Sequence, residues 1–296
     1  MTIIEALERA KALKQEARRR DSVANAELHA IPSDDSGSRA ILHDVVRVDA
    51  GRVEPAPEQF AGLARVEFDT AACERNRVLL VDAPASEMAG RAAAAYRLLR
   101  SRVQHRSKGR KWSCIGITSA GPGEGKSLTT VNVALSIARE KQRPVYVLDL
   151  DMRNPSVLKY LGVQPPQELS AFFAEGVGHE QVLYATAVEN LVIAGNVAPA
   201  IGASELLASS RLEELLVLIR RRSPDAMILI DLPPVTSTDE ALVVAPRLDV
   251  IFLVVSEGVT RRDALARALH LLSDFPVEGV IMNRSSENFS GDYYSY

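Results

Sequence analysis

SAGPGEGKSLTT, residues 119–130, is the stretch that decides the fold. It is a glycine-rich loop that ends in Gly125-Lys126-Ser127, between a β-branched run at 114–118 and a helical pattern at 126–140. In this context the glycines let backbone N–H groups converge on phosphate oxygens, and the N-terminus of the helix adds positive potential. A lysine at the position of Lys126 reaches the β- and γ-phosphates, and Ser127 supplies a Mg²⁺ ligand. The loop therefore predicts a site for Mg²⁺ and a nucleoside triphosphate; a simple strand-to-helix turn is the alternative.

Carboxylates end two further strand patterns. PVYVLDLDMRNP, residues 144–155, places Asp149 and Asp151 at the carboxyl end of its strand, and MILIDLPPV, residues 227–235, places Asp231 there. The carboxyl ends of parallel strands meet at the ligand crevice, and residues two apart on a strand share a face. Both acids of the first pair can then approach one Mg²⁺-nucleotide, and Asp231 is placed to organise the metal. Solvated turn acids are the alternative for all three.

The alternation of short apolar runs with helical patterns predicts an α/β fold. The apolar runs lack a polar face, which is typical of parallel strands covered by helices on both sides. The expected strands are 114–118, 145–149, 191–194, 227–231, 250–255 and 279–282. The expected helices are 126–140, 203–221, 239–246 and 261–273.

The remaining sequence divides the chain into four expected parts. Residues 1–20 form an amphipathic pattern, and 21–76 is rich in turn formers and low in apolar residues, which predicts a partly disordered linker. The domain is expected over 77–283, with a helix starting near Ser86, and the tyrosine-rich segment 284–296 is expected to be a flexible tail.

Composition excludes several classes of protein. The chain of 296 residues carries 35 Lys+Arg and 38 Asp+Glu, a formal charge of −3, which argues against nucleic-acid binding through clustered basic residues. The two cysteines give neither a disulfide framework nor a zinc site, which favours the reducing cytoplasm. The longest apolar runs are far shorter than the roughly 20 residues that cross a bilayer, and the N-terminus does not have the pattern of a secretory signal.

The three motifs at 119–127, 147–155 and 228–234 resemble the Walker-type motifs of bacterial tyrosine kinases of exopolysaccharide and capsule systems. YRLLR at 96–100 and ASELLAS at 203–209 extend the resemblance, which is closest to stand-alone autokinases of exosortase-associated polysaccharide clusters. It implies a P-loop NTPase fold of the deviant-Walker, Min/Par-like type. It further implies transfer of the ATP γ-phosphate in trans to C-terminal tyrosines, here Tyr293, Tyr294 and Tyr296. This autophosphorylation is expected to regulate polymer synthesis and export.

The resemblance also implies roles for individual residues. Asp149 is the expected base for the tyrosine hydroxyl, which suits a phenol of pKa near 10, while Lys126 and Asp151 assist the transfer. Asn283 is expected to contact adenine, with a turn-forming role as the alternative. The expected metal ligands are Ser127, Asp151 and Asp231. The expected nucleotide-binding residues of the loop are Gly121, Gly123, Glu124, Gly125, Lys126, Ser127 and Leu128.

Two positions depart from the family pattern. The first glycine of the loop is Ala120. Relatives commonly carry Glu-x-x-Arg-x-x-Arg on the helix before the core, where the acid and arginines join neighbouring subunits; here Arg97 and Arg100 are present but the acid position is Ala94. The two arginines are expected at an oligomer interface, with a solvated helix face as the alternative.

The resemblance also implies partners. A homo-oligomer is expected, held at the inner membrane by a polysaccharide co-polymerase that activates the kinase. A cognate tyrosine phosphatase is a further candidate partner. The helix at 1–20 is expected either to dock to that partner or to pack on its own core.

Two rival functions share these features. A Par/Min-type positioning ATPase has the same fold, but its loop usually carries an extra lysine where this chain has Gly121, and it has no tyrosine-rich tail. A non-catalytic scaffold that gates a polysaccharide exporter through bound nucleotide is the second rival.

Overall fold

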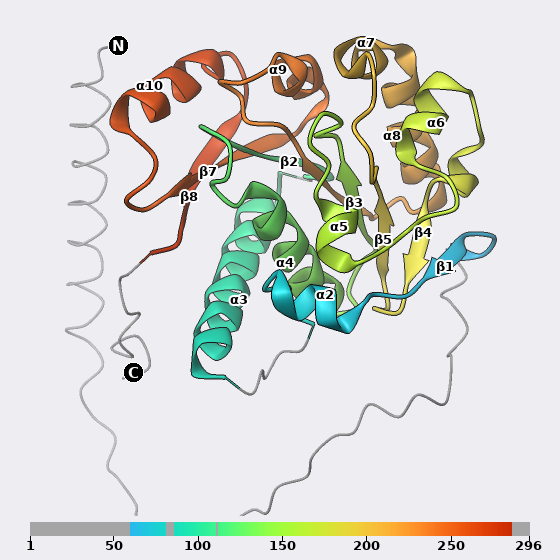
Figure 1. Cartoon of the computed structure of the whole chain (residues 1–296), viewed down its shortest axis with the longest axis horizontal. Helices are drawn as coiled ribbons and strands as arrows, with labels where there is room; N and C mark the ends of the chain where they lie inside the picture. Colours follow the sequence, from blue (N-terminus) through green and yellow to red (C-terminus); the bar gives the residue numbers. More distant parts are fainter. Residues whose placement is uncertain (1–59, 81–85, 111, 286–296) are drawn as a thin grey trace, which may run out of the picture. The chain divides into compact units, whose positions relative to one another are not determined.

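The computed structural model describes residues 60–80, 86–110 and 112–285, which fall in one compact unit, Glu54–Tyr296. In them an eight-stranded sheet has the order β1-β4-β5-β3-β6-β2-β7-β8 (Figure 1). Every neighbouring pair is parallel except β4 and β5, so the predicted, mostly parallel fold is confirmed. The strands are β1 (Ala64–Val66), β2 (Cys114–Ser119), β3 (Val145–Asp149), β4 (Tyr184–Thr186), β5 (Leu191–Ala194), β6 (Met227–Asp231), β7 (Val250–Ser256) and β8 (Val277–Asn283).

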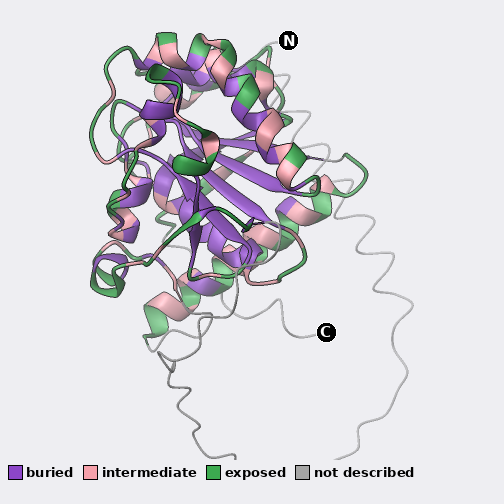
Figure 2. Ribbon diagram, turned by 90° about the vertical axis from the view of Figure 1, so that its right-hand side faces the viewer, coloured by how far each residue is buried: buried purple, intermediate pink, exposed green. Residues whose placement is uncertain are grey.

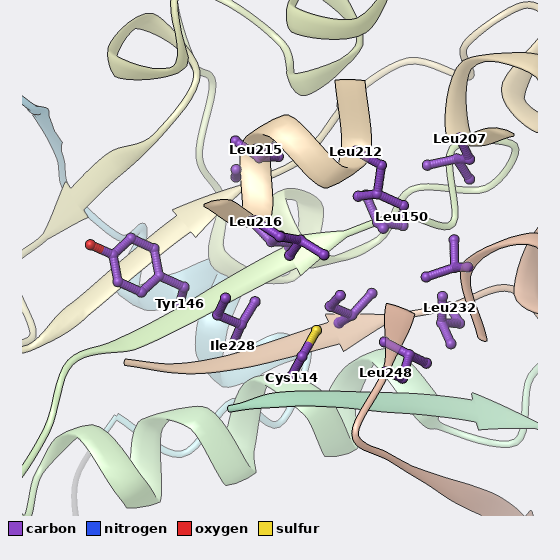
Figure 3. Packing of buried hydrophobic residues seen from close by; sticks show 14 of the residues in the cluster. Cys114, Tyr146, Leu150, Leu207, Leu212, Leu215, Leu216, Ile228, Leu232 and Leu248 are labelled. Atoms are coloured by element: carbon purple, nitrogen blue, oxygen red, sulfur yellow. The ribbon is translucent and has the colours of Figure 1, made fainter. Parts of the chain in front are cut away.

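Helices cover both faces of the sheet because its central strands are apolar on both sides. In β3, Val145 and Val147 join one buried cluster and Tyr146 and Leu148 join the other, as alternate residues of a strand must. Figure 2 shows the buried strands between the helices, and Figure 3 shows the second cluster around Tyr146. One face packs against α2 (Thr70–Arg75), α3 (Glu87–Ser107), α4 (Lys126–Ala138) and α5 (Val157–Leu161). The other packs against α6 (Leu169–Ala174), α7 (Ala203–Ala208), α8 (Ser210–Arg222), α9 (Glu240–Val244) and α10 (Arg262–Leu271).

The sheet order brings the three motif-bearing strands side by side. β6 lies between β3 and β2, and the register pairs Asp231 with Asp149 on one side and with Ile117 on the other. The phosphate-loop motif follows β2, so the loop and the carboxylates of β3 and β6 meet at the carboxyl ends of three adjacent strands. The ligand crevice of a parallel α/β sheet forms at such an edge.

The expected domain boundary at residue 77 is corrected. β1 pairs with β4 at the edge of the sheet, and α2 buries Cys73 completely, so both belong to the domain although they precede residue 77. Asp69 caps α2 through its side chain and donates its backbone N–H to the carbonyl of Leu161 in α5. A three-residue strand and a six-residue helix are too short to produce a periodic pattern, which explains why sequence assigned them to the linker.

The single helix expected at 203–221 is two helices. Ser209 has an extended backbone with ψ 162°, and its hydroxyl accepts from the backbone N–H of Arg211, so it caps a new helix, α8. The helix expected at 239–246 ends earlier, because Pro246 lies in a 3₁₀ turn, Ala245–Arg247, that follows α9. Among the described residues, no helix is long and apolar enough to cross a membrane. The expected helix at 1–20 and the tail tyrosines lie outside the described residues.

Candidate nucleotide and phosphotransfer site

The loop between β2 and α4 has the backbone that a phosphate-binding loop needs. Gly123 and Gly125 adopt left-handed conformations, with φ of 72° and 92°, and α4 begins at Lys126. A Cβ atom at Gly125 would lie 2.0 Å from Nδ2 of Asn283, so this position combines a positive φ with a close neighbour that excludes any side chain. The loop thus passes directly into a 13-residue helix, whose N-terminal amides can bind phosphate.

Lys126 is buried among carboxylates. Its Nζ lies 2.7 Å from Oδ2 of Asp151 and 3.6 Å from Oδ2 of Asp231, and it donates to the hydroxyl of Ser127 at 3.0 Å. Burial by itself lowers the pKa of Lys126, but the carboxylates of Asp231 and Asp151 outweigh it, and the net shift is upward. Lys126 is therefore a permanent cation at the point where the three motifs meet.

Asp231 has the features of a metal-organising acid. It is fully buried, Thr130 donates to its Oδ1 at 3.5 Å, and its Oδ2 lacks a hydrogen-bond partner within the described residues. Burial raises the pKa of Asp231, and Lys126 opposes the shift. With Ser127 and Asp151 it offers a set of oxygen ligands, which Mg²⁺ prefers. Among the described residues there is no cluster of three or more His, Cys, Asp or Glu side chains that could hold a metal ion.

Asp149 is buried in a different way. Its Oδ1 accepts from the backbone N–H of Asp151 at 3.1 Å, and its Oδ2 accepts from those of Ser156 and Val157 at 2.8 and 2.9 Å. These bonds fold the segment between β3 and α5 around the carboxylate. Burial, followed by the charge of Asp231, raises the pKa of Asp149, while Lys126 and the amides oppose the shift.

The far side of the phosphate loop is held by residues that follow β7 and by residues at the end of β8. Thr260 donates its hydroxyl to Oε1 of Glu124 at 2.6 Å, and Asn283 donates its amide to the carbonyl of Glu124 at 2.9 Å. Arg284 donates to the carbonyl of Gly123 at 3.0 Å. The carboxylate of Glu124 is thus engaged with Thr260, and its Oε2 is buried without a hydrogen-bond partner among the described residues.

Asn283 and Leu128, two of the expected nucleotide-binding residues, make contacts within the chain that the sequence did not predict. Asn283 holds the loop and accepts from the backbone N–H of Arg284 at 2.9 Å, as a turn-forming asparagine does, so its amide is engaged at both ends. Leu128 packs its side chain against the core, which leaves its backbone N–H as the group that can serve a nucleotide. Gly121 lies at the start of the loop, where a Cβ would be 3.5 Å from Oε1 of Glu124.

The arginines of α3 differ in environment. Arg100 donates to the carbonyl of Ser136 at 3.1 Å and its Nε lies 3.0 Å from Oε1 of Glu140, so it ties α3 to the end of α4 within one chain. Arg97 is half-buried one turn earlier on α3. These intrachain bonds do not test a role at an oligomer interface, and a contact between copies remains a proposal for both Arg97 and Arg100.

Three polar residues of the site were not predicted from sequence. Thr130 bonds to Asp231 and to the carbonyl of Lys126, Thr260 holds Glu124, and Glu240 is buried on α9, where it pairs with Nε of Arg153. Glu240 could have been predicted as a buried acid, because it stands within the otherwise apolar helical pattern TDEALVV. Thr260 gave no local signal, because it lies 136 residues from its partner.

Comparison with known families agrees with this geometry. The sequence profile of the ParA family, described as that of a NUBPL iron-transfer P-loop NTPase, matches residues 112–290. The chain is 28% identical over 205 residues to the tyrosine-protein kinase YwqD of Bacillus subtilis (strain 168). This alignment covers 68% of this chain and 84% of YwqD. It is also 30% identical over 184 residues to the tyrosine-protein kinase CpsD of Streptococcus pneumoniae serotype 4. This alignment covers 60% of this chain and 78% of CpsD.

A longer relative and a solved structure extend the comparison. The succinoglycan biosynthesis transport protein ExoP of Rhizobium meliloti is 28% identical over 236 residues, which covers 77% of this chain and 29% of ExoP. The BceF tyrosine kinase domain superposes with a TM-score of 0.57 and 30% identity over 63% of this chain and 75% of that domain.

Proposed function

The chain belongs to the bacterial tyrosine kinase family, within the ParA group of P-loop NTPases, and on this premise we propose that it is an ATP-dependent tyrosine autokinase. It transfers the γ-phosphate in trans to Tyr293, Tyr294 and Tyr296 of another copy. The observation that supports this most strongly is the convergence of Lys126, Asp151 and Asp231 beneath the phosphate loop. Phosphoryl transfer depends mainly on such positioning and charge neutralisation.

The residues divide the work of binding. The amides of the loop and of the first turn of α4 bind the phosphates, and Lys126 turns from the carboxylates towards the β- and γ-phosphates. Ser127, Asp151 and Asp231 hold Mg²⁺, which neutralises phosphate charge when bound. Asn283 holds the loop from the β8 side, and in this proposal it also contacts the base.

Asp149 accepts the proton of the acceptor hydroxyl. The phenol O–H bond breaks, a bond forms from the phenol oxygen to the γ-phosphorus, and the bond from that phosphorus to ADP breaks. A carboxylate whose pKa is raised by burial is a better base near neutral pH than an ordinary aspartate. Oδ2 of Asp149 accepts two backbone N–H groups and Oδ1 accepts one, so the acceptor hydroxyl would donate to the remaining lone pair of Oδ1.

The proposed setting is the control of exopolysaccharide polymerisation and export. The similarity to ExoP, a succinoglycan biosynthesis transport protein, supports this setting. We propose a cytoplasmic protein held at the inner membrane by a co-polymerase that activates it. Copies associate through the helix that carries Arg97 and Arg100, and a phosphatase removes phosphate from the tail tyrosines.

Transfer of radiolabelled phosphate from ATP tests the proposal. The full chain is incubated with Mg-ATP, with and without a cytoplasmic fragment of the co-polymerase, and phosphotyrosine is mapped by mass spectrometry. Label on the three tail tyrosines is expected, and Lys126→Met abolishes it. ATP hydrolysis without phosphotyrosine would instead indicate a positioning ATPase, and nucleotide binding without turnover would indicate a scaffold.

A further inference from the structure

Helix α5 connects the proposed base to a segment outside the nucleotide-binding motifs. It has only five residues, Val157–Leu161. Its N-terminal end lies on Asp149, because the backbone N–H groups of Ser156 and Val157 donate to Oδ2 of that carboxylate. A helix of this length is unstable by itself, so the position of α5 depends on the groups that hold its two ends.

The C-terminal end of α5 is held by α2, which lies beside it in Figure 1. The carbonyl of Leu161 accepts from the backbone N–H of Asp69 at 3.0 Å and from the thiol of Cys73 at 3.8 Å. The side-chain amide of Asn76 donates to the carbonyl of Tyr160 at 3.4 Å. Because the last carbonyls of a helix have no partner within the helix, α2 supplies hydrogen bonds that α5 cannot make itself.

The two helices approach each other closely at Gly162, the residue that ends α5. Gly162 has a φ of 67°, and a Cβ atom there would lie 2.4 Å from Cβ of Asp69 and 2.9 Å from Cβ of Ala72. Cys73 is fully buried and lies in the same apolar cluster as Leu161. With no side chain between the two backbones, a displacement of α2 is passed directly to α5.

The residues that follow α2 are bound to α4, the helix that begins at the phosphate loop. Asn132 of α4 is buried, and its Oδ1 accepts from the backbone N–H of Leu79 at 2.8 Å. The amide of Asn132 donates to the carbonyl of Arg77 at 3.2 Å. Residues 69–80, which we call the support segment, thus connect the helix that holds the proposed base with the helix that follows the phosphate loop.

We infer that the support segment positions the carboxylate of Asp149 for phosphoryl transfer and that Asp69 is a positioning residue. Asp69 caps α2 through its side chain, which accepts from the backbone N–H of Ala72 at 3.1 Å, while its own N–H holds Leu161. The two amides on Oδ2 fix the rotation of the Asp149 carboxylate, which directs the remaining lone pair of Oδ1 to the acceptor hydroxyl. The inference rests on the proposed function, because it concerns the base of that reaction.

Removal of the cap of α2 tests the inference without removing a group of the site. Asp69→Ala in the full chain should lower kcat for phosphorylation of a peptide with the sequence of residues 286–296 about tenfold, within the roughly 10²-fold that a misplacement of 1 Å can cost. The KM for ATP should equal that of the wild type, because the bonds of Asp69 lead to α5 and not to the phosphate loop. Asp69→Asn retains a capping side chain and should restore kcat.

Ser209→Ala is the matched control. Ser209 caps α8 on the other face of the sheet, where its side chain accepts from the backbone N–H of Arg211. Loss of either cap should lower the melting temperature by about 2–4 °C, but Ser209→Ala should leave kcat unchanged. Equal kcat values for Asp69→Ala and Ser209→Ala would overturn the inference.

A double substitution shows whether the effect passes through Asp149. In the Asp149→Asn chain, Asp69→Ala should cause no further loss of kcat, because two substitutions that act through one group are not additive. A further tenfold loss in this background would refute positioning through Asp149.

Hydrogen exchange separates this inference from the proposed function. Asp69→Ala should speed exchange of the backbone amides of Ser156 and Val157 relative to the wild type and to Ser209→Ala, whether or not transfer occurs. Absence of phosphotyrosine in the wild type would refute the kinase proposal. Equal exchange of these two amides in the Asp69→Ala and Ser209→Ala chains would instead refute the role of the support segment.

Discussion

Replacement of Lys126 by methionine tests the charge arrangement of the site in the absence of nucleotide. The Lys126 side chain is 10% exposed, and its two carboxylate partners, Asp151 and Asp231, are 3% and 0% exposed. Methionine preserves much of the apolar stem but leaves these carboxylates without their cation. Loss of one partner of a buried ion pair costs about 3–5 kcal/mol, and the lower figure applies here because Lys126 retains some exposure.

This loss converts into a measurable shift of the melting temperature. For a domain of this size, about 3 kcal/mol corresponds to a decrease of about 6–12 °C. Lys141→Met is the matched control, because Lys141 pairs with Glu189 at the surface, where the two side chains are 61% and 41% exposed. An exposed pair contributes at most about 1 kcal/mol, so the control should lose at most about 4 °C.

Calorimetry without ATP and Mg²⁺ compares the two variants, and a second scan adds Mg-ATP. At a hundred times its Kd, the ligand should stabilise wild type and Lys141→Met by about 2.7 kcal/mol, whereas Lys126→Met should gain little. If Lys126→Met melts no lower than Lys141→Met, or gains as much from Mg-ATP, then Lys126 does not have the role that its position indicates.

Three further predictions concern the loop, the base and the acceptor. Thr260→Val should weaken ATP binding up to about tenfold in calorimetric titration, because buried Glu124 loses the hydrogen bond to its Oε1; unchanged affinity would show that the loop holds its shape without Thr260. Asp149→Asn should lower phosphorylation about 10²- to 10⁴-fold and also lower the melting temperature, since an amide cannot accept all three backbone N–H groups; an unchanged rate would exclude a base at this position. Mass spectrometry should find phosphate on the tyrosines of 293–296, and light scattering should find smaller particles after phosphorylation, because each phosphate adds about −1.5 to −2 charges. Phosphate found mainly on Tyr146, which is buried and bonded to Ser223, would contradict this account.

The strands that sequence predicted best are those buried on both faces. The expected bounds of β3, β5 and β6 match the structure, because a run of apolar residues between turn formers has few other interpretations. β1 and β4 were missed: each has three residues, and β4 carries a polar Thr186. Such strands gain their stability from the neighbouring strand, which no local pattern records.

The same distinction holds within the site. The loop of 119–130 and the carboxylates at the ends of β3 and β6 could be predicted because each lies within one continuous motif. Thr260 and the pair of Arg153 with Glu240 could not, since their partners lie 136 and 87 residues away in sequence. Sequence thus predicts the groups that we propose for the chemistry better than the groups that position them.

The charge balance of the site explains why a nucleotide and a divalent cation belong together here. Asp149, Asp151 and Asp231 are buried with one ammonium group, that of Lys126, so the fully ionised site would carry a net charge of −2, from three negative charges and one positive. Burial raises the pKa of Asp149 and of Asp231, although the charge of Lys126 opposes both shifts. Triphosphate by itself would add further negative charge close to these acids. A divalent cation bound to its phosphates cancels the excess, and Lys126, released from Asp151, can then face the phosphates.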